Sequence, residues 1–313
     1  MAFRFAVLAS GSAGNAGWIE VDGFGLLLDG GLRPRELGRR LEEVAGSWRQ
    51  ARGVLLTHTH GDHWNNRTLR HLRRSRIPLY CHPGHHDALR HASTEFSRLC
   101  QAGLVHDYEE GRELTLAPSL TCQPIAVRHD SGPTFGFRFT GPGDLFGQPA
   151  RLAYVSDLGC WDAALARALA EVDVLAVEFN HDVELQYASG RHPRLIARVL
   201  GDEGHLSNQQ AAALVREIVR YSTPGRLRHV VQLHLSGQCN RPSLAVAAVH
   251  QALADGADLP RIHTAHQDRP GPMLRVETKT GAGPRRRATP HATAAPRYAR
   301  KSNPAQPWLP GLE

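Results

Sequence analysis

The chain has 313 residues, of which 41% are hydrophobic, and a formal net charge of +7. This length is sufficient for a sizeable core in one large domain or two smaller ones. No apolar run reaches the roughly 18 to 20 residues that a membrane span requires, and the N-terminus lacks the pattern of a secretion signal, so we expect a cytoplasmic protein.

Short β-like runs alternate with helix-like segments along most of the chain. Strands are predicted from apolar runs bounded by turn residues, and helices from apolar residues at helical spacing. The predicted strands are 4–10, 17–21, 25–29, 53–57, 119–129, 134–140, 151–157, 172–179 and 227–235. The predicted helices are 34–45, 161–171, 207–221 and 242–254.

Residues 281–313 differ in composition from the rest of the chain. They are rich in Pro, Ala, Arg and Thr, and they carry six basic residues against Glu313 alone. Such a segment cannot bury enough surface to offset its ordering entropy, so we predict a folded domain at 1–280 followed by a disordered basic tail. The tail could attract a polyanion or be a solvated terminus, and its closing peptide QPWLPGL (306–312) could dock on a protein partner.

The cysteines are Cys81, Cys100, Cys122, Cys160 and Cys239, scattered along the chain and never in a C-x-x-C pair. Neither a disulfide framework nor a thiolate zinc site is indicated. We expect reduced, mostly buried thiols.

The segment LLTHTHGDHW (55–64) places three histidines and an aspartate within six positions, directly behind an apolar run. The His58-x-His60 pair can aim two imidazoles at one ion, while Asp62 and His63 can turn toward a second position nearby. A histidine-rich loop could also be polar surface. Four ligand-type residues in so short a span, followed by suitable partners further along, favour a metal site.

Further ligand-type residues stand at or just after the C-terminal ends of predicted strands, where loops gather polar side chains along one sheet edge. His129 could complete the first metal site and His234 the second, and Asp157 could bridge both through its two oxygens. Mixed imidazole and carboxylate ligation suits zinc, manganese or iron. The residues at these strand ends are Asp29, His58, His129, Asp157, Glu178 and His234.

A second group of histidines lies in CHPGHHD (81–87), namely His82, His85 and His86. They stand at the start of a predicted helix and have no matching partner motif. Surface or loop histidines are therefore favoured over a second metal site. The basic run HLRRSR (71–76) could contact a nucleic-acid backbone, although a solvated face is slightly favoured.

The H-x-H-x-D-H motif, together with the later histidines and aspartate, resembles the metallo-β-lactamase fold over roughly residues 3 to 255. The resemblance implies an α/β protein, a four-layer αβ/βα sandwich with the metals at one edge of its two sheets. It also implies two divalent ions, Zn²⁺ or Mn²⁺, held by His58, His60, Asp62, His63, His129, Asp157 and His234.

Four further segments resemble the YycJ/WalJ-type branch of this family, which is thought to contain DNA exonucleases. Cys239 stands where an Asn is expected in that branch, and His192 where a Tyr is expected. The four segments are LASGSAGN (8–15), VEFNHD (177–182), GDEGHLSNQQAA (201–212) and HLSGQCNRPSLA (234–245).

Other nucleases of the family help to assign two more residues. In tRNase Z-like enzymes, a Glu at a strand end and a His in a Gly-His-Ser-type motif donate a proton, and Glu178 and His205 occupy similar places here. The 77 residues from Asp157 to His234 leave no room for the domain that β-CASP nucleases insert there. A long Gly/Pro-rich arm of the kind that tRNase Z uses is also missing from the sequence.

The resemblance implies a metal-dependent hydrolase that cleaves phosphodiester bonds of nucleic acid by attack of a metal-bridging hydroxide. Asp62, Glu178 and His205 are the expected catalytic residues, with His205 protonating the leaving oxygen. A DNA exonuclease without strong sequence specificity is expected, with a DNA repair role by analogy. A small-ester or thioester hydrolase, an RNA-processing nuclease and a metal-binding regulatory protein are the alternatives.

Several residues near these motifs could support the site or bind substrate. Asp29 could fix the tautomer of a ligating imidazole or cap a turn. The Gly-rich turn at 10–15 could approach a phosphate or merely reverse the chain, and a helix N-cap at 207–208 could place a positive helix end near substrate. The candidate substrate-binding residues are Ser10, Ser12, Asn15, His181, Ser207 and Asn208.

Overall fold

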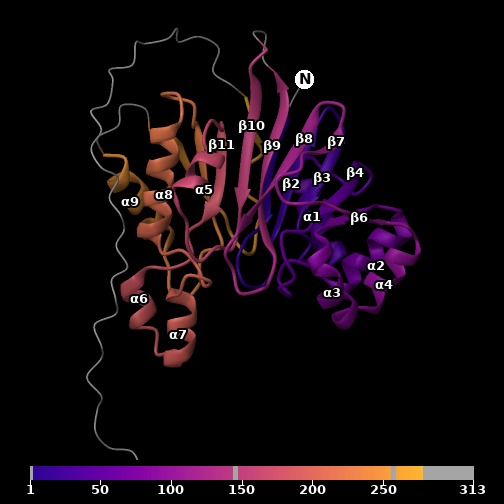
Figure 1. Cartoon of the computed structure of the whole chain (residues 1–313), viewed down its shortest axis with the longest axis horizontal. Helices are drawn as coiled ribbons and strands as arrows, with labels where there is room; N and C mark the ends of the chain where they lie inside the picture. The colour runs from indigo at the N-terminus through magenta and orange to yellow at the C-terminus, as the bar shows by residue number, and fades with distance from the viewer. Residues whose placement is uncertain (1–2, 144–146, 255–258, 278–313) are drawn as a thin grey trace, which may run out of the picture. The chain divides into compact units, whose positions relative to one another are not determined.

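The computed structural model describes residues 3–143, 147–254 and 259–277 (Figure 1). All of these residues belong to one compact unit, Met1–Thr280. The predicted basic tail at 281–313, with its QPWLPGL peptide, lies outside the described residues.

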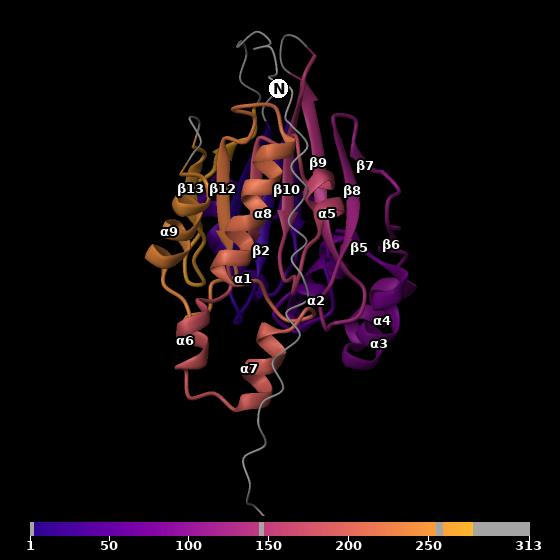
Figure 2. The ribbon, with the colours of Figure 1, turned by 60° about the vertical axis from the view of Figure 1, so that its left-hand side comes forward.

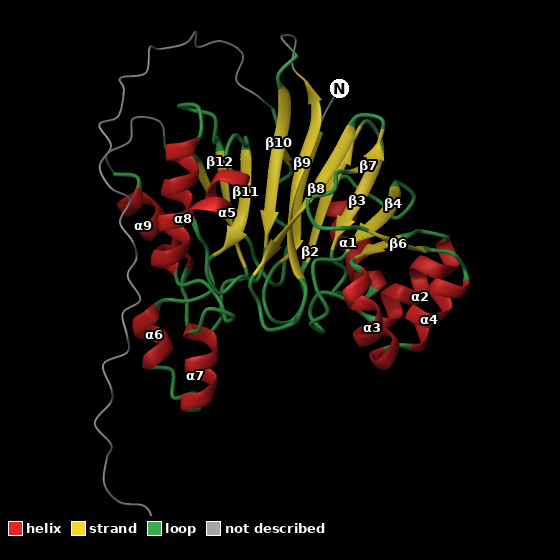
Figure 3. Ribbon diagram, in the orientation of Figure 1, coloured by secondary structure: helices red, strands yellow, loops and turns green. Residues whose placement is uncertain are grey.

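The strands of the described residues form two seven-stranded sheets (Figure 3). The first sheet contains β1 (Phe3–Ala9), β2 (Ala16–Val21), β3 (Phe24–Leu28), β4 (Ala51–Leu55), β5 (Leu79–Cys81), β6 (Val105–Asp107) and β14 (Leu274–Arg275), in the order β14-β1-β2-β3-β4-β5-β6. The second contains β7 (Leu114–Ala117), β8 (Leu120–Val127), β9 (Thr134–Gly143), β10 (Pro149–Val155), β11 (Val174–Glu178), β12 (His229–Leu233) and β13 (Arg261–Thr264), in the order β13-β12-β11-β10-β9-β8-β7.

Helices cover the outer face of each sheet. The first sheet packs against α1 (Pro34–Glu43), α2 (Asn66–Ser75), α3 (His86–Ala92) and α4 (Thr94–Gln101), and the 3₁₀ turn η1 (Pro83–His85) directly precedes α3. The second packs against α5 (Ala163–Ala168), α8 (Asn208–Tyr221) and α9 (Pro242–Ala252). Figure 1 shows these two groups of helices on opposite sides of the paired sheets.

Three apolar clusters hold the layers together. Between the sheets, Phe5 and Tyr154 meet edge to face with ring centroids 6.3 Å apart. Leu37 of α1 and Phe96 of α4 are fully buried against the first sheet, as is Leu214 of α8 against the second. Burial of apolar side chains on both faces of each sheet favours this layering. The predicted four-layer αβ/βα sandwich is confirmed.

Two helices lie outside the layers. Figures 1 and 2 both show α6 (Val183–Tyr187) and α7 (Pro193–Leu200) beyond the lower ends of the strands rather than on a sheet face. Because β3 to β6 and β10 to β13 run in parallel, their carboxyl ends meet along one edge of each sheet. Loops at that edge carry the candidate site.

The predicted strands and helices are all present, with ends shifted by a few residues. The sequence prediction missed the short strands β5, β6, β13 and β14, because two to four residues show too little periodicity to detect. It also missed β7 and the helices α2, α4, α6 and α7. None of the helices in the described residues has the length and apolar character needed to cross a membrane. All five cysteines are free thiols, and Cys81, Cys122 and Cys239 are buried.

Candidate metal centre and active site

Three of the predicted site residues leave their strands with an unusual backbone. Asp29 follows β3, Asp157 follows β10 and His234 follows β12, and their φ angles are 62°, 51° and 54°. A left-handed conformation costs a non-glycine residue about 1 to 2 kcal/mol. Such outliers persist only where surrounding contacts fix them, and they concentrate at functional sites. These backbone outliers therefore lie at the sheet edge where the sequence predicts the metal site.

A first cluster consists of His58, His60 and His129, whose potential ligand atoms all lie within 4.8 Å of one another. His129 Nε2 lies 3.2 Å from His60 Nδ1. The other nitrogen of His129, Nδ1, donates to the carbonyl oxygen of Gly204 at 2.9 Å. Since a carbonyl can only accept, this contact fixes the tautomer and leaves Nε2 with a lone pair toward the cluster.

A second cluster consists of Asp62, His63, Asp157 and His234, again within 4.8 Å of one another. Asp157 is its centre, with Oδ2 at 2.6 Å from His63 Nε2 and Oδ1 at 2.9 Å from His234 Nδ1. Oδ2 of Asp157 also lies 3.3 Å from Nε2 of His58 in the first cluster. This one carboxylate therefore touches both clusters, as expected of a bridging ligand.

The Asp29 carboxylate supports the second cluster from behind. Its Oδ2 accepts a hydrogen bond from His63 Nδ1 at 2.8 Å, and its Oδ1 accepts from the backbone N–H of Thr57 at 2.8 Å. Both Asp29 and His63 are fully buried. The hydrogen bond leaves His63 Nε2 as the nitrogen that faces Asp157, which is the contact expected if Asp29 fixes the orientation of this imidazole.

Burial and neighbouring charges shift the pKa values of this group strongly. Burial alone would raise the pKa of Asp157, but His234 and His63 hold it well below its ordinary value. Burial opposes protonation of His63, yet Asp29 and Asp157 raise its pKa to about 10. Burial, with His63 adding to it, lowers the pKa of His58 well below its usual range. Asp157 is thus ionised beside a neutral His58, and both can bind a cation directly, whereas His63 must release a proton before its Nε2 can do so.

Unsatisfied atoms show that the residues fit divalent metal ions. His58 Nε2, Asp157 Oδ1 and His234 Nε2 are buried, and none has a partner in hydrogen-bond geometry among the described residues, although Asp157 Oδ1 lies 2.9 Å from His234 Nδ1. An unsatisfied buried polar atom costs about 1 to 3 kcal/mol, and a bound cation would remove this cost for all three. The donor set contains only imidazole nitrogens and carboxylate oxygens, which zinc and manganese both accept.

Glu178 and His205 form a pair beside the second cluster. His205 Nδ1 donates to Glu178 Oε1 at 2.7 Å, and Glu178 Oε2 accepts the backbone N–H groups of Leu158 and Leu206, both at 3.1 Å. Burial would lower the pKa of His205, but Glu178 raises it above its ordinary value. A potential ligand atom of each residue also lies within 4.8 Å of one of Asp157. Both Glu178 oxygens already accept hydrogen bonds, so Glu178 and His205 fit a proton-transfer pair better than additional metal ligands.

The Gly-rich turn contributes mainly internal contacts. Ser10 Oγ accepts the backbone N–H of His234 at 2.8 Å, and Asn15 Nδ2 donates to Asp62 Oδ2 at 3.0 Å. Both are buried, whereas Ser12 is exposed. In the loop after β3, a Cβ on Gly31 would come within 1.8 Å of the Asp62 carbonyl oxygen. A glycine is therefore required there for this loop to approach the loop that carries Asp62. Ser10 and Asn15 therefore position site residues, and Ser12 alone of the turn's candidates faces solvent.

The remaining substrate candidates are also interior. Ser207 is the N-cap of α8, with its side chain accepting from Gln210 N at 3.2 Å, so the predicted cap is confirmed. Asn208 exchanges hydrogen bonds of 2.9 Å with Asn240. His181 is fully buried, and neither ring nitrogen has a hydrogen-bond partner among the described residues. All three border the site without an exposed polar atom that reaches outward.

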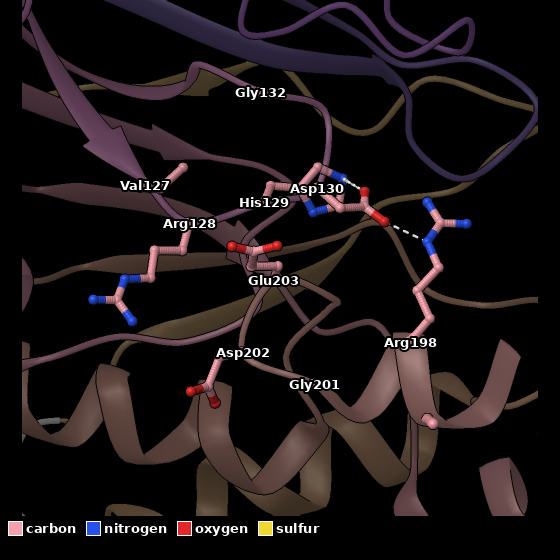
Figure 4. Close-up of a pocket in the computed structure, with 10 residues that line it drawn as sticks. Val127, Arg128, His129, Asp130, Gly132, Arg198, Gly201, Asp202 and Glu203 are labelled. Carbon is pink, nitrogen blue, oxygen red and sulfur yellow. Dashed lines mark hydrogen bonds and ion pairs between the residues drawn. The ribbon is translucent and has the colours of Figure 1, made fainter. Parts of the chain in front are cut away.

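A pocket that no sequence pattern predicts opens beside the first cluster (Figure 4). Its volume is about 840 Å³. Arg198 of α7 reaches across to pair with Asp130, whose other oxygen lies 3.5 Å from His60 Nε2. The lining residues are Val127, Arg128, His129, Asp130, Gly132, Ala197, Arg198, Gly201, Asp202 and Glu203. The pocket therefore joins the predicted metal centre to the α7 region.

Residues 26–223, more than half of the chain, match the beta-lactamase superfamily domain. The chain therefore belongs to this family, a family of metal-dependent hydrolases whose fold implies divalent metal ions at the clusters described above.

Two curated relatives have similar sequences. The chain is 28% identical over 258 residues to exodeoxyribonuclease WalJ of Streptococcus pneumoniae and 26% identical over 260 residues to exodeoxyribonuclease YycJ of Bacillus anthracis. Each match covers 82% of this chain and 90% of the relative. Among solved structures, the metallo-beta-lactamase fold protein YhfI from Bacillus subtilis matches with a TM-score of 0.61 at 13% identity, over 87% of this chain and 99% of that one. This last likeness shows the fold.

Proposed function

We propose that the chain is a two-metal DNA exonuclease that hydrolyses phosphodiester bonds. The observation that carries this proposal is Asp157, which contacts His58 of one cluster and both His63 and His234 of the other. Enzymes that displace a phosphodiester oxygen commonly place two ions about 3.5 to 4 Å apart. The proposed ligands are His58, His60 and His129 for one ion, Asp62, His63 and His234 for the other, and Asp157 for both.

The two relatives support nucleic acid as the substrate, because both are named exodeoxyribonucleases and their matches span most of each chain. When bound, Zn²⁺ or Mn²⁺ ions would lower the pKa of a water molecule toward roughly 7 and offset charge on the phosphate oxygens. A cytoplasmic location and a role in DNA repair belong to the same proposal.

His205 is the proposed proton donor to the leaving oxygen. Its Nδ1 proton is held by Glu178, so its Nε2 can carry the proton that is transferred. Glu178 is fully buried, and two backbone N–H groups orient its carboxylate. Burial would raise its pKa, but the charge of His205 lowers it, so the carboxylate is ionised. His205 is 19% exposed, so substrate can reach it.

Asp62 is the third proposed catalytic residue. Burial would raise its pKa, but the contact with His234 at 3.5 Å and the charge of His63 lower it, so the carboxylate is ionised. Asn15 fixes one of its oxygens at 3.0 Å, and a fifth of the side chain remains exposed. Asp62 can therefore accept a hydrogen bond from the attacking water and orient it.

The substrate backbone is proposed to enter through the pocket beside His129. Arg198 at its mouth is half-exposed, and its guanidinium can exchange Asp130 for a phosphate. The proposed contacts of the pocket are with phosphate rather than with base edges, so we expect cleavage that is largely indifferent to sequence. Ser12 and the basic tail are further proposed contacts with the substrate backbone, and the QPWLPGL peptide stays a predicted protein-docking segment.

A substrate panel tests the proposal. Purified protein with Mn²⁺ or Zn²⁺ is incubated with end-labelled duplex DNA, single-stranded DNA and RNA, and in parallel with a lactam and a thioester. We expect DNA to shorten progressively from one end, and an Asp157→Asn protein to be inactive. Preferential cleavage of RNA would indicate an RNA-processing nuclease. Hydrolysis of the thioester or the lactam alone would contradict the proposal.

A further inference from the structure

We propose that Cys81, His86 and Asp107 form an additional divalent-cation site of the zinc type, which shares no residue with the candidate active site. The Cys81 sulfur, a ring nitrogen of His86 and a carboxylate oxygen of Asp107 lie within 4.8 Å of one another. The inference is independent of the proposed nuclease function, because it depends only on this separate group of side chains.

The fold places these three residues together from separate elements. Cys81 is the last residue of β5 and Asp107 the last residue of β6, and the two are direct partners in the parallel pairing of these strands. Paired residues on neighbouring strands project from the same face of a sheet. His86 begins α3, five residues after Cys81, so the chain returns over that face.

The contacts within the group resemble ligands that converge on one point. His86 Nε2 lies 2.8 Å from Asp107 Oδ1, yet it is buried and has no partner in hydrogen-bond geometry among the described residues. The nitrogen is therefore close to the carboxylate but is not oriented to form a hydrogen bond with it. A cation between the two would satisfy both and would also take the buried Cys81 sulfur as a ligand.

The donor set indicates the class of metal. Thiolate sulfur, imidazole nitrogen and carboxylate oxygen are the three ligand types that Zn²⁺ accepts, and thiolate argues against Mg²⁺, Ca²⁺ and Mn²⁺. Two of the ligands are anionic when bound, which matches the charge of a divalent ion. The Asp107 side chain is 48% exposed, so a cation can enter from solvent and keep a water molecule as a fourth ligand.

Such an ion would stabilise the edge of the first sheet at β6. The strand β6 has three residues and lies at the edge of its sheet, so few backbone hydrogen bonds hold it. The neighbouring His85 in η1 donates from Nε2 to the carbonyl oxygen of Pro133 at 2.8 Å, in the loop that follows His129. A cation that ties β5 and β6 to α3 would therefore also steady the support of this loop.

Cobalt substitution tests the site directly. A thiolate ligand gives Co²⁺ an intense charge-transfer absorption in the near ultraviolet, whereas imidazole and carboxylate ligands do not. The candidate active-site clusters contain no cysteine. Metal-free full-length protein titrated with Co²⁺ should therefore develop a thiolate band, and this band should persist in an Asp157→Asn protein that has lost nuclease activity.

Matched variants assign the band. We expect Cys81→Ser to abolish it and Cys100→Ser, at a half-buried cysteine of α4, to retain it. Asp107→Asn should raise the Co²⁺ concentration at half-saturation by roughly tenfold or more, since loss of a ligand should lower metal affinity at least as much as loss of a residue that orients a ligand. This variant keeps the test valid if Cys81→Ser does not fold. A saturated wild-type protein without a thiolate band, or a band that survives Cys81→Ser, would overturn the proposal.

Discussion

The carboxylate of Glu178 holds the imidazole of His205, with 2.7 Å between Oε1 and Nδ1. The pair links a strand end to a helix start, because Glu178 ends the interior strand β11 while His205 precedes α8. Glu178 is buried and anchored by two backbone N–H groups, so His205 inherits a fixed orientation. The pair is the proposed proton donor, and neither residue is among the proposed metal ligands.

Replacing His205 should slow the chemical step without releasing metal. A positioned general acid contributes about 10² to 10⁴ in rate, so turnover of DNA by His205→Ala should fall by a factor in this range. Metal content, measured by elemental analysis, should stay at the wild-type level. His250→Ala, at an exposed histidine of α9, is the matched control and should cleave at the normal rate. Undiminished cleavage by His205→Ala would remove His205 from the chemistry.

Replacing Asp29 should weaken metal binding although Asp29 is not a proposed ligand. The Asp29→Asn side chain keeps the size of Asp29 but loses the charge that orients His63 Nδ1. Loss of such a supporting carboxylate typically costs 10- to 100-fold in metal affinity, roughly the change expected here. Competition with a chromophoric chelator measures it. Asp162→Asn, which preserves the N-cap of α5, should bind metal as the wild type does. Equal affinity in both variants would contradict the role of Asp29.

Arg198 should contribute to DNA binding through a phosphate. Removing one phosphate contact lowers the magnitude of the slope of log K against log salt by about one, so Arg198→Ala should bind DNA more weakly and with a shallower salt dependence. Binding measured at several salt concentrations gives this slope. The control is Arg220→Ala on α8, where the exposed arginine pairs with Glu217. If the two variants share the wild-type slope, the pocket does not bind the backbone.

His229 should make stability depend on pH away from the site. Burial, and then the neighbouring His263 at 3.0 Å, lower the pKa of His229 to about 4. The unfolded chain therefore gains a proton near pH 6.5 while the folded protein does not, so stability falls as pH decreases from about 6.5 to about 4. Because the side chain is only partly buried, solvent limits the loss to about 1 kcal/mol or less.

Urea unfolding at pH 7 and pH 5 measures this effect. A His229→Gln protein cannot take up the proton, so its stability should change less between the two pH values than that of the wild type. The same loss in both proteins would show that other groups cause the pH dependence.

Much of the site could be predicted because its residues follow strands with a clear apolar pattern. Asp29, Asp157 and His234 each stand just past such a run, and parallel strands bring their ends to one edge. The His58 to His63 loop is a local motif in the sequence. The fold class and the candidate ligands could therefore be predicted from local patterns in the sequence.

The parts that could not be predicted depend on contacts between distant segments. Arg198 meets Asp130 across 68 positions, and neither residue stands in a recognisable motif. Ser10 and Asn15 were predicted to bind substrate, but only the folded chain shows that they are buried against His234 and Asp62.

The proposed additional cation site shows the same limit. The sequence favours surface or loop histidines at 82–86, because no partner motif accompanies them. The partner, Asp107, lies on the strand β6, which has three residues and gives no periodic signal. Its place beside Cys81 follows from the pairing of β5 with β6.

We propose that two neighbouring cations share Asp157. A crystal structure of the protein grown with Mn²⁺ or Zn²⁺, with anomalous scattering recorded to locate the ions, is the decisive measurement. We predict two adjacent peaks, one contacted by His58, His60 and His129 and the other by Asp62, His63 and His234, with Asp157 between them. A single peak at this edge, or none while these side chains point apart, would exclude the two-metal centre.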